Sequence, residues 1–196
     1  RHTPSWNEKT REVVDKRIAV HDGPRFFNET EWETLSAVCK RIVPQPSDRP
    51  PVPLPAYVDH KLLENVQEGY QYLPLPQDRE AWQRGLKGLD AVAKSKHGAR
   101  YHLLPSAEQD ELLKQMQKGE LKDDEFATMP SDKFFSKRLL FDITSAYYAH
   151  PTAWSEIGFG GPASPRGYVR MKLNDRDPWE ASEAHDQPEK ARRENG

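Results

Sequence analysis

The stretch that decides the fold class is PQDREAWQRGLKGLDAVAKSKHG, residues 76–98. Its apolar side chains return every three or four positions, which is the period of one face of an α-helix. Gly98 stands where a helix commonly ends in a left-handed residue. The pattern predicts an amphipathic helix from near Pro76 to Gly98, and its buried stripe is Trp82, Leu86, Leu89 and Ala93.

Two further helices are predicted before this stretch. The first opens at Thr30, which stands three residues before Glu33 as in a capping box, and is closed by Pro44. The second runs from about Pro55, which suits a first helical turn, to Glu68 before Gly69. Their apolar stripes are Trp32, Leu35, Cys39 and Ile42 in the first, and Val58, Leu62 and Val66 in the second.

Two more helices are predicted after it. One begins at Ser106, paired with Gln109 as a second capping box, and ends before Gly119. The other opens at Ser131. Because no stretch shows sustained strand alternation, the fold class is all-α, an irregular bundle of about five helices. The stripes of these last two are Leu112, Leu113 and Met116, then Phe134, Phe135, Leu139, Ile143 and Tyr147.

Three polar segments surround the bundle and set the expected domain organisation. Residues 1–25 form an irregular N-terminal arm, residues 26–173 the helical domain with its C-terminal loop, and residues 174–196 a charged tail. Six prolines between Pro44 and Pro55 predict an extended strap, either a stiff connector or a surface for a partner. We expect arm, strap and tail to be ordered by a partner, since they offer little internal burial.

Composition excludes several classes of function. The net charge of −2 disfavours nucleic-acid binding, which needs clustered basic residues. No apolar run approaches the roughly 18 residues of a membrane span, so no direct span is expected. The chain begins at Arg1 rather than Met, which fits a processed protein or a trimmed one.

The sequence offers almost no catalytic chemistry, and we expect no catalytic, cofactor-binding or metal-binding residue. The seven histidines are scattered without metal-ligand spacing, and the single Cys39 lies on an apolar helix face. The glycines of residues 158–163 match a dinucleotide motif, but a helix precedes them and prolines follow. Residues 123–125 are interpreted as solvated acids, and Thr30 as a helix cap that explains the sequon at Asn28.

The segment from Ala146 to Arg170 is the strongest functional candidate. It leaves a helix through Pro151 and enters a loop rich in Gly, Pro, aromatic and Arg residues, with no further helix expected. Such residues anchor protein interfaces, although the aromatics could instead fold back to cap the core. The candidate partner-binding residues are Trp154, Phe159, Arg166, Tyr168 and Arg170.

Several motifs follow one another in a recognisable order: Phe26-Phe27, Arg41-Ile42-Val43-Pro44, Gly85-Leu86 with Leu89-Asp90-Ala91, residues 103–109 with Leu112-Leu113, Phe134-Phe135, and Tyr147 to Phe159. Together they resemble the gluconate 2-dehydrogenase subunit 3 family, the small or gamma subunits of bacterial FAD-dependent dehydrogenases of sugars and sugar acids. The resemblance covers about Phe26 to Arg170. In place of a Tyr-Gly-Gly-Asn-like element, residues 153–162 read AWSEIGFGGP, so the partner could belong to another branch, such as one that oxidises glycosides.

The resemblance implies a non-catalytic subunit that stabilises a large FAD-containing partner of the glucose-methanol-choline type. That partner often stands beside a cytochrome c subunit, so FAD would lie in the partner and haem or an iron–sulfur cluster elsewhere in the complex. The resemblance also implies a heterodimeric, periplasmic protein exported through a twin-arginine signal upstream of Arg1. The alternative is a self-sufficient helical enzyme or binding module that uses His150, Glu156 and Arg166 in the 150–170 loop.

Overall fold

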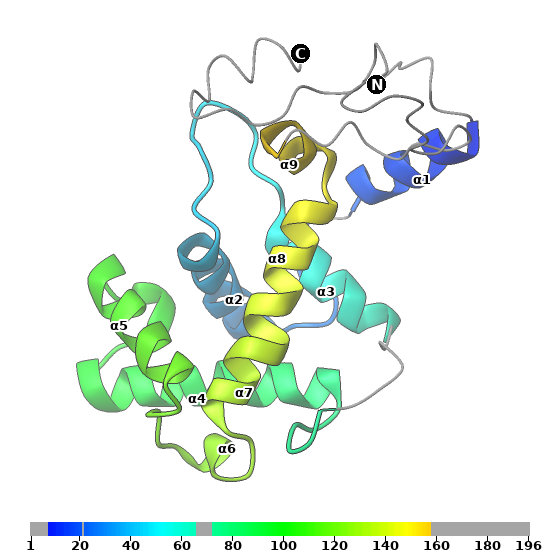
Figure 1. Cartoon of the computed structure of the whole chain (residues 1–196). Helices are drawn as coiled ribbons and strands as arrows, with labels where there is room; N and C mark the ends of the chain where they lie inside the picture. Colours follow the sequence, from blue (N-terminus) through cyan, green and yellow to red (C-terminus); the bar gives the residue numbers. More distant parts are fainter. Residues whose placement is uncertain (1–7, 21, 66–71, 158–196) are drawn as a thin grey trace, which may run out of the picture. The chain divides into compact units, whose positions relative to one another are not determined.

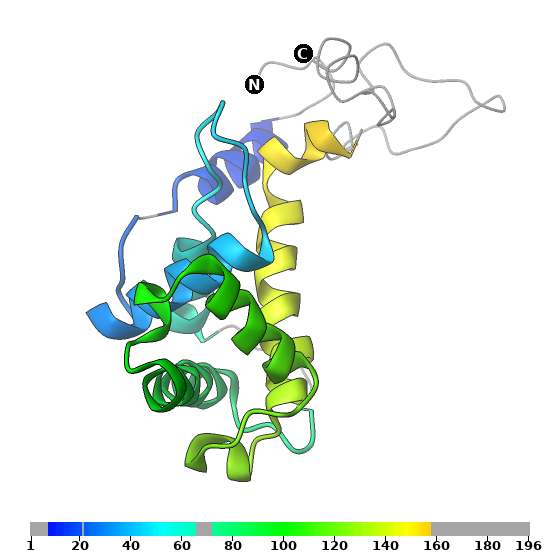
Figure 2. The same ribbon diagram turned by 90° about the vertical axis from the view of Figure 1, so that its left-hand side faces the viewer.

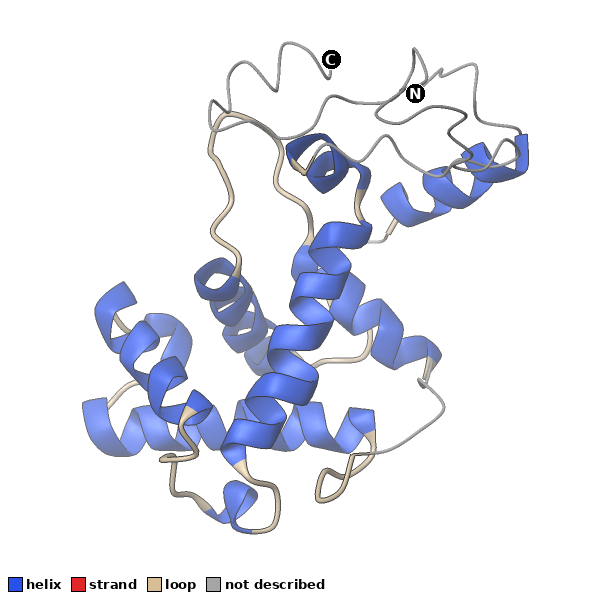
Figure 3. Cartoon of the chain, viewed as in Figure 1, coloured by secondary structure: helices blue, strands red, loops and turns tan. Residues whose placement is uncertain are grey.

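The computed structural model describes residues 8–20, 22–65 and 72–157. Within these ranges the chain contains helices and connecting loops but no strand, as Figure 3 shows. The predicted all-α class is therefore confirmed. The described residues fall into two units, one of residues 22–146 and one of residues 8–20 with 147–157, and each is described by itself. The predicted boundaries at residues 25 and 173 stay predictions.

The first unit begins with α2 (Glu29–Ile42), α3 (Leu54–Glu64) and α4 (Asp78–His97) (Figure 1). A single 3-10 turn, η1 (Tyr101–Leu103), leads into α5 (Ser106–Gln117). Two short helices follow, α6 (Asp124–Ala127) and α7 (Ser131–Phe134). A π-helical turn, η2 (Phe135–Leu139), then joins α7 to α8 (Leu140–Ala149). The second unit contains α1 (Glu8–Ile18) and α9 (Pro151–Glu156).

The core of the first unit lies between α2, α4 and the rod formed by α7, η2 and α8. In Figures 1 and 2, α4 runs across this rod near its α7 end. Trp82 of α4 is fully buried and meets Phe134 edge to face, with ring centroids 5.5 Å apart. Leu86, Leu89 and Ala93 are buried on the same face of α4, which confirms the predicted stripe. Gly98 ends this helix at a φ of +75°, as its position predicted.

The predicted capping boxes of two helices are wrong, although α5 does begin at Ser106 as predicted. Asn28 caps α2: its side chain accepts from Glu31 N (2.9 Å), and Glu31 accepts from Asn28 N (3.0 Å). The capping box therefore begins two residues before Thr30, at a pair with the same spacing. Gln109 caps nothing, because it is buried and donates to the carbonyl of Tyr101 (3.0 Å).

Helix α3 is shorter than predicted. It ends at Glu64, where Asn65 turns left-handed at a φ of 54°. Asn tolerates this conformation better than most residues, so it can end a helix as glycine does. The predicted end at Glu68, with Gly69 behind it, lies outside the described residues.

Two segments predicted as irregular contain helices. Glu8–Ile18 is helical within the predicted arm, with Thr10 and Val14 buried and Glu12 paired to Lys9 and Lys16 on its surface. Residues 151–156 form α9 at the start of the predicted loop. Pro151 begins this helix rather than ending the previous one, which suits a residue whose fixed φ is helical and whose missing N–H costs nothing in a first turn.

The proline strap between α2 and α3 is an irregular open loop (Figures 1 and 2). Its two arms are joined by one side chain: Gln45 donates to Val52 O (2.9 Å) and accepts from Val52 N (2.6 Å). Val52 is only 2% exposed. The expectation that this segment has little internal anchoring is therefore wrong for the strap.

Replacing Gly85 by Ala should destabilise the first unit, although Gly→Ala inside a helix normally stabilises by about 1 kcal/mol. A Cβ at Gly85 would overlap the ring of Phe134, which is packed against Trp82. We expect the free energy of unfolding to fall by about 1–3 kcal/mol, which is typical of an overpacked core. Urea unfolding measures it, with the exposed Gln83→Ala on the same helix as control. A G85A variant more stable than the wild type would contradict this packing.

Candidate partner-binding surface

A cluster of buried charges fixes how α8 sits in the first unit. Asp142 of α8 is 4% exposed. Its carboxylate accepts from Lys61 Nζ of α3 (2.7 Å) and from the indole Nε1 of Trp82 of α4 (2.8 Å). Beside it, Arg138 of η2 pairs with Asp78 of α4 at 2.7 Å. Four elements therefore meet through ionic contacts. The geometry of these contacts leaves α8 little freedom to rotate about its own axis.

Burial dominates the energetics of this cluster. It raises the pKa of Asp142 even though Lys61 and the Trp82 N–H act to lower it. A buried ion pair of this kind gives little net stability, because desolvation offsets the attraction, but breaking one partner is costly. The cluster accordingly specifies which side of α8 faces inward.

Because Asp142 points inward, the outward side of α8 carries no charge from Leu140 to Ala146. Leu140 is 37% exposed and Phe141 46% exposed. Thr144 lies beside them and satisfies its own hydroxyl by donating to Leu140 O (2.7 Å). We call Leu140, Phe141, Thr144 and Ser145 the α8 face. In a chain with 31% charged residues, an uncharged and partly apolar helix face is typical of a covered surface rather than a solvated one.

The loop before α4 reaches the beginning of this helix. The ring of Tyr72 lies 4.9 Å from Lys137 Nζ and 5.6 Å from the guanidinium carbon of Arg138. Both cations are in η2, directly before the α8 face. Leu73, the next residue of the loop, is 93% exposed. The apolar surface near η2 is therefore contributed by two segments, the loop before α4 and the first turn of α8.

The sequence interpretation missed the α8 face, although a signal was present. Residues 139–148, LLFDITSAYY, are apolar or uncharged on every side of a helix except at Asp142. A helix with so little charge around it is expected to be covered on more than one side. Only the inward stripe of Leu139, Ile143 and Tyr147 was recognised.

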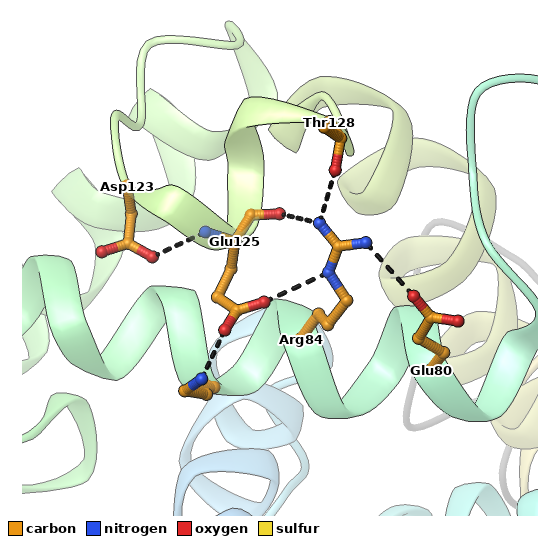
Figure 4. Close-up of polar contacts among 6 residues, drawn as sticks. Glu80, Arg84, Asp123, Glu125 and Thr128 are labelled. Atoms are coloured by element: carbon orange, nitrogen blue, oxygen red, sulfur yellow. Dashed lines mark hydrogen bonds and ion pairs between the residues drawn. The ribbon is translucent and has the colours of Figure 1, made fainter.

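A second ionic cluster, drawn in Figure 4, fastens α6 to α4. Arg84 Nε binds the Glu125 carboxylate (3.1 Å), and its Nη2 donates to Glu125 O (2.7 Å) and Thr128 Oγ1 (2.8 Å). Lys87 binds the other Glu125 oxygen, and Asp123 caps α6 by accepting from Glu125 N. The interpretation of residues 123–125 as solvated acids is thus wrong for Asp123 and Glu125. Both have structural roles.

The predicted partner anchors fall at the limit of the described residues. Trp154 lies on α9, is 6% exposed, and donates its indole N–H to the carbonyl of Tyr148 (2.9 Å). This is the position of a side chain that packs within its own unit. The partner-binding role of Trp154 stays a prediction, as do those of Phe159, Arg166, Tyr168 and Arg170, which lie outside the described residues.

Two residues of the alternative catalytic interpretation have structural contacts. His150 caps α9 by accepting from Thr152 N through Nδ1 (3.2 Å), and burial lowers its pKa. The Tyr147 hydroxyl donates a short hydrogen bond to Glu156. Arg166 lies outside the described residues. The described geometry therefore provides helix capping and packing at these positions.

The described residues offer no converging ligand set for a metal. No group of three or more His, Cys, Asp or Glu side chains among them could hold an ion. Cys39 is 3% exposed, and burial raises the pKa of its thiol, so it acts as a small apolar side chain. Among the described helices, none combines the length and the apolar character needed to cross a bilayer.

These features define an all-α protein whose described charge clusters serve its own folding and whose outward apolar surface is suited to binding. The chain matches the family model described as gluconate 2-dehydrogenase subunit 3 over residues 29–161, and it belongs to this family. The match confirms the resemblance drawn from the sequence motifs. Comparisons with curated proteins and with solved structures returned no match.

Removing Asp142 should destabilise the first unit strongly, because Lys61 and the Trp82 N–H would lose their buried acceptor. We expect Asp142→Leu to lower the free energy of unfolding by about 3 kcal/mol. The double variant Lys61→Met/Asp142→Leu should lose at least about 1 kcal/mol less than the sum of the two single variants. Urea unfolding measures all three. Lys87→Met, which breaks an exposed pair, is the control and should change the free energy of unfolding far less than Asp142→Leu. Additive effects at Lys61 and Asp142 would contradict the coupling.

His150 should make the stability of the second unit depend on pH. The folded-state pKa lies below the ordinary value of 6.5, so the unfolded chain takes up the proton first as pH falls. The stability that neutral His150 contributes is therefore fully present above about pH 6.5, and it is lost as the pH falls through the folded-state pKa. His150→Asn keeps a capping side chain but cannot titrate, so wild type should lose stability relative to it below pH 6.5. Thermal unfolding between pH 5 and 8 measures this difference, and a constant difference would refute it. His150→Ala, which cannot cap, should be about 1 kcal/mol less stable than His150→Asn.

Proposed function

We propose that this chain is the non-catalytic small subunit that binds and stabilises a large FAD-dependent dehydrogenase subunit of the glucose-methanol-choline type. Membership of a family of dehydrogenase subunits supports this function at the coarse level. The observation that carries the finer proposal is the α8 face, an uncharged helix surface held outward by the inward-facing Asp142. The catalysed reaction is then the partner's oxidation of a sugar, sugar acid or glycoside.

The chemistry of the α8 face favours a protein partner. The cores of protein interfaces are depleted in charged residues and enriched in aromatic ones. Phe141 and Leu140 supply apolar area, and Thr144 adds no unsatisfied polar group because its hydroxyl is bonded within α8. The helix is fixed to the core beneath it, so little conformational entropy is lost on binding.

The remaining parts of the proposal depend on family membership alone. We infer that FAD belongs to the large subunit and that a cytochrome c subunit, or another haem or iron–sulfur component, receives the electrons. We also infer that the complex is periplasmic and that a twin-arginine signal exports the large subunit in its folded form. The segment from Trp154 to Arg170 would supply a second contact with the large subunit.

Replacing Phe141 by Asp should weaken complex formation, because a charge would be buried at the centre of the α8 face. We expect at least thirtyfold weaker association, equivalent to about 2 kcal/mol. The affinity-tagged full chain is co-expressed with the flavoprotein dehydrogenase of the same source, and the captured FAD absorbance is measured. Leu103→Asp is the matched control, since Leu103 is also an exposed apolar residue (65%) but lies on η1.

Three outcomes separate the parts of this proposal. Loss of capture with Phe141→Asp but not with Leu103→Asp supports the α8 face. Equal capture by both variants would reject the α8 face while keeping the accessory function. A wild-type chain that captures no flavoprotein, or that shows flavin absorbance when purified alone, would reject the accessory function itself.

A further inference from the structure

A groove lies between α2 and the proline strap. Its volume is about 840 Å³, and five of the strap's six prolines line one wall. The opposite wall is the side of α2 that presents Trp32, Ser36 and Lys40. These three residues are four positions apart, so they share one face of the helix. The groove therefore has one wall of proline rings and one helical wall with an aromatic anchor.

The groove is formed in advance of any binding. The Gln45 side chain holds the two arms of the strap together through both of its bonds to Val52. Val52 and Leu54, at the end of the strap that leads into α3, are themselves buried, 2% and 1% exposed. Proline rings restrict the remaining backbone freedom. Binding of a ligand in this groove therefore costs little conformational entropy, because the walls of the groove are already ordered.

The helical wall offers hydrogen-bond donors that no described residue of the chain binds. Within the described part of the protein, the indole N–H of Trp32, the hydroxyl of Ser36 and the ammonium of Lys40 have no bonding partner, in contrast to the bonded indoles of Trp82 and Trp154. Unlike those two, Trp32 is only half-buried. Its N–H is thus free to bond to an incoming ligand.

The strap wall has the opposite character. Its five lining prolines have no N–H, so at those positions the backbone can offer only carbonyl acceptors. The helical wall therefore supplies donors, while the strap wall supplies mainly the apolar surface of proline rings. An extended polypeptide is the complement of this arrangement, because its two edges present carbonyls and N–H groups while its side chains contact aromatic and proline rings.

The charges in the groove favour the same ligand class. Lys40 is the cation and Asp22 the anion among the lining residues. A groove with one charge of each sign gives no net attraction for a phosphate or another strongly charged molecule. It suits a segment that is close to neutral and apolar.

We propose that the groove between α2 and the proline strap binds an extended apolar segment of the large dehydrogenase subunit. The inference rests on the proposed accessory function and adds a further recognition site to the α8 face and the Trp154–Arg170 segment. Trp32 is the anchor: its ring packs on an apolar side chain of the segment and its N–H donates to a backbone carbonyl. The strap acts as the rigid opposing wall.

Two substitutions at Trp32 in the full chain test the proposal, with the purified large flavoprotein subunit as the probe. Trp32→Phe keeps an aromatic ring and removes the N–H, so binding should weaken about three- to tenfold. Trp32→Ala removes the anchor as well, and binding should weaken at least thirtyfold. Leu103→Asp, on η1, is the binding control. Wild-type affinity in both Trp32 variants would overturn the groove assignment.

A photo-crosslinking amino acid in place of Ser36 identifies the occupant directly. Cross-links to neighbouring residues of one segment of the large subunit are expected, and the same amino acid at exposed Gln83 of α4 should give none there. Cross-links to a second copy of this chain, or none at Ser36 within a formed complex, would overturn the groove assignment. If the wild-type chain forms no complex, the accessory function is rejected instead. Rejection of the groove and rejection of the accessory function are therefore distinguishable.

Discussion

The ion pair between Asp142 and Lys61, joined by the Trp82 indole N–H, is the constraint on which the first unit depends. It ties α8 to α3 and α4 at a point where burial opposes the carboxylate charge. An apolar core alone would allow α8 to rotate, because this helix is apolar on several sides. One inward acid removes that freedom, since any rotation would leave a buried charge unpaired. This contact is one of two features that orient the outward surface of α8.

The π-helical turn works together with the ion pair. Residues 135–139 pass from α7 to α8 with a wider turn, which places Arg138 beside Asp78 while Phe134 and Phe135 stay buried. Such turns insert one residue relative to the α-helical repeat and shift the faces on either side. The buried stripe of α7 can therefore differ in register from that of α8. This shift leaves Leu140 and Phe141 outward while Leu139 and Ile143 remain in the core.

The two candidate binding sites share a physical character that suits an accessory subunit. The α8 face has no charge, and the groove beside the strap has one charge of each sign. Each is held rigid from beneath, the first by Asp142 and the second by Gln45. In a chain with 31% charged residues, the apolar parts of both surfaces are unfavourable to leave in water. Binding a large partner would remove both surfaces from solvent, which agrees with membership of a family of dehydrogenase subunits.

The sequence by itself determined the all-α class, the buried stripe of α4 with its glycine end, and the family, because helical periodicity and ordered motifs are local signals. It could not place caps where two candidates share one spacing, as with Asn28 and Thr30, nor show whether Pro151 ends or begins a helix. Only the tertiary structure decided that Asp142 turns inward, that Glu125 is held by Arg84, and that Trp32 faces a groove. Each of these depends on contacts across 40 or more residues or on a facing loop, and no local pattern encodes which partner a charged side chain will meet.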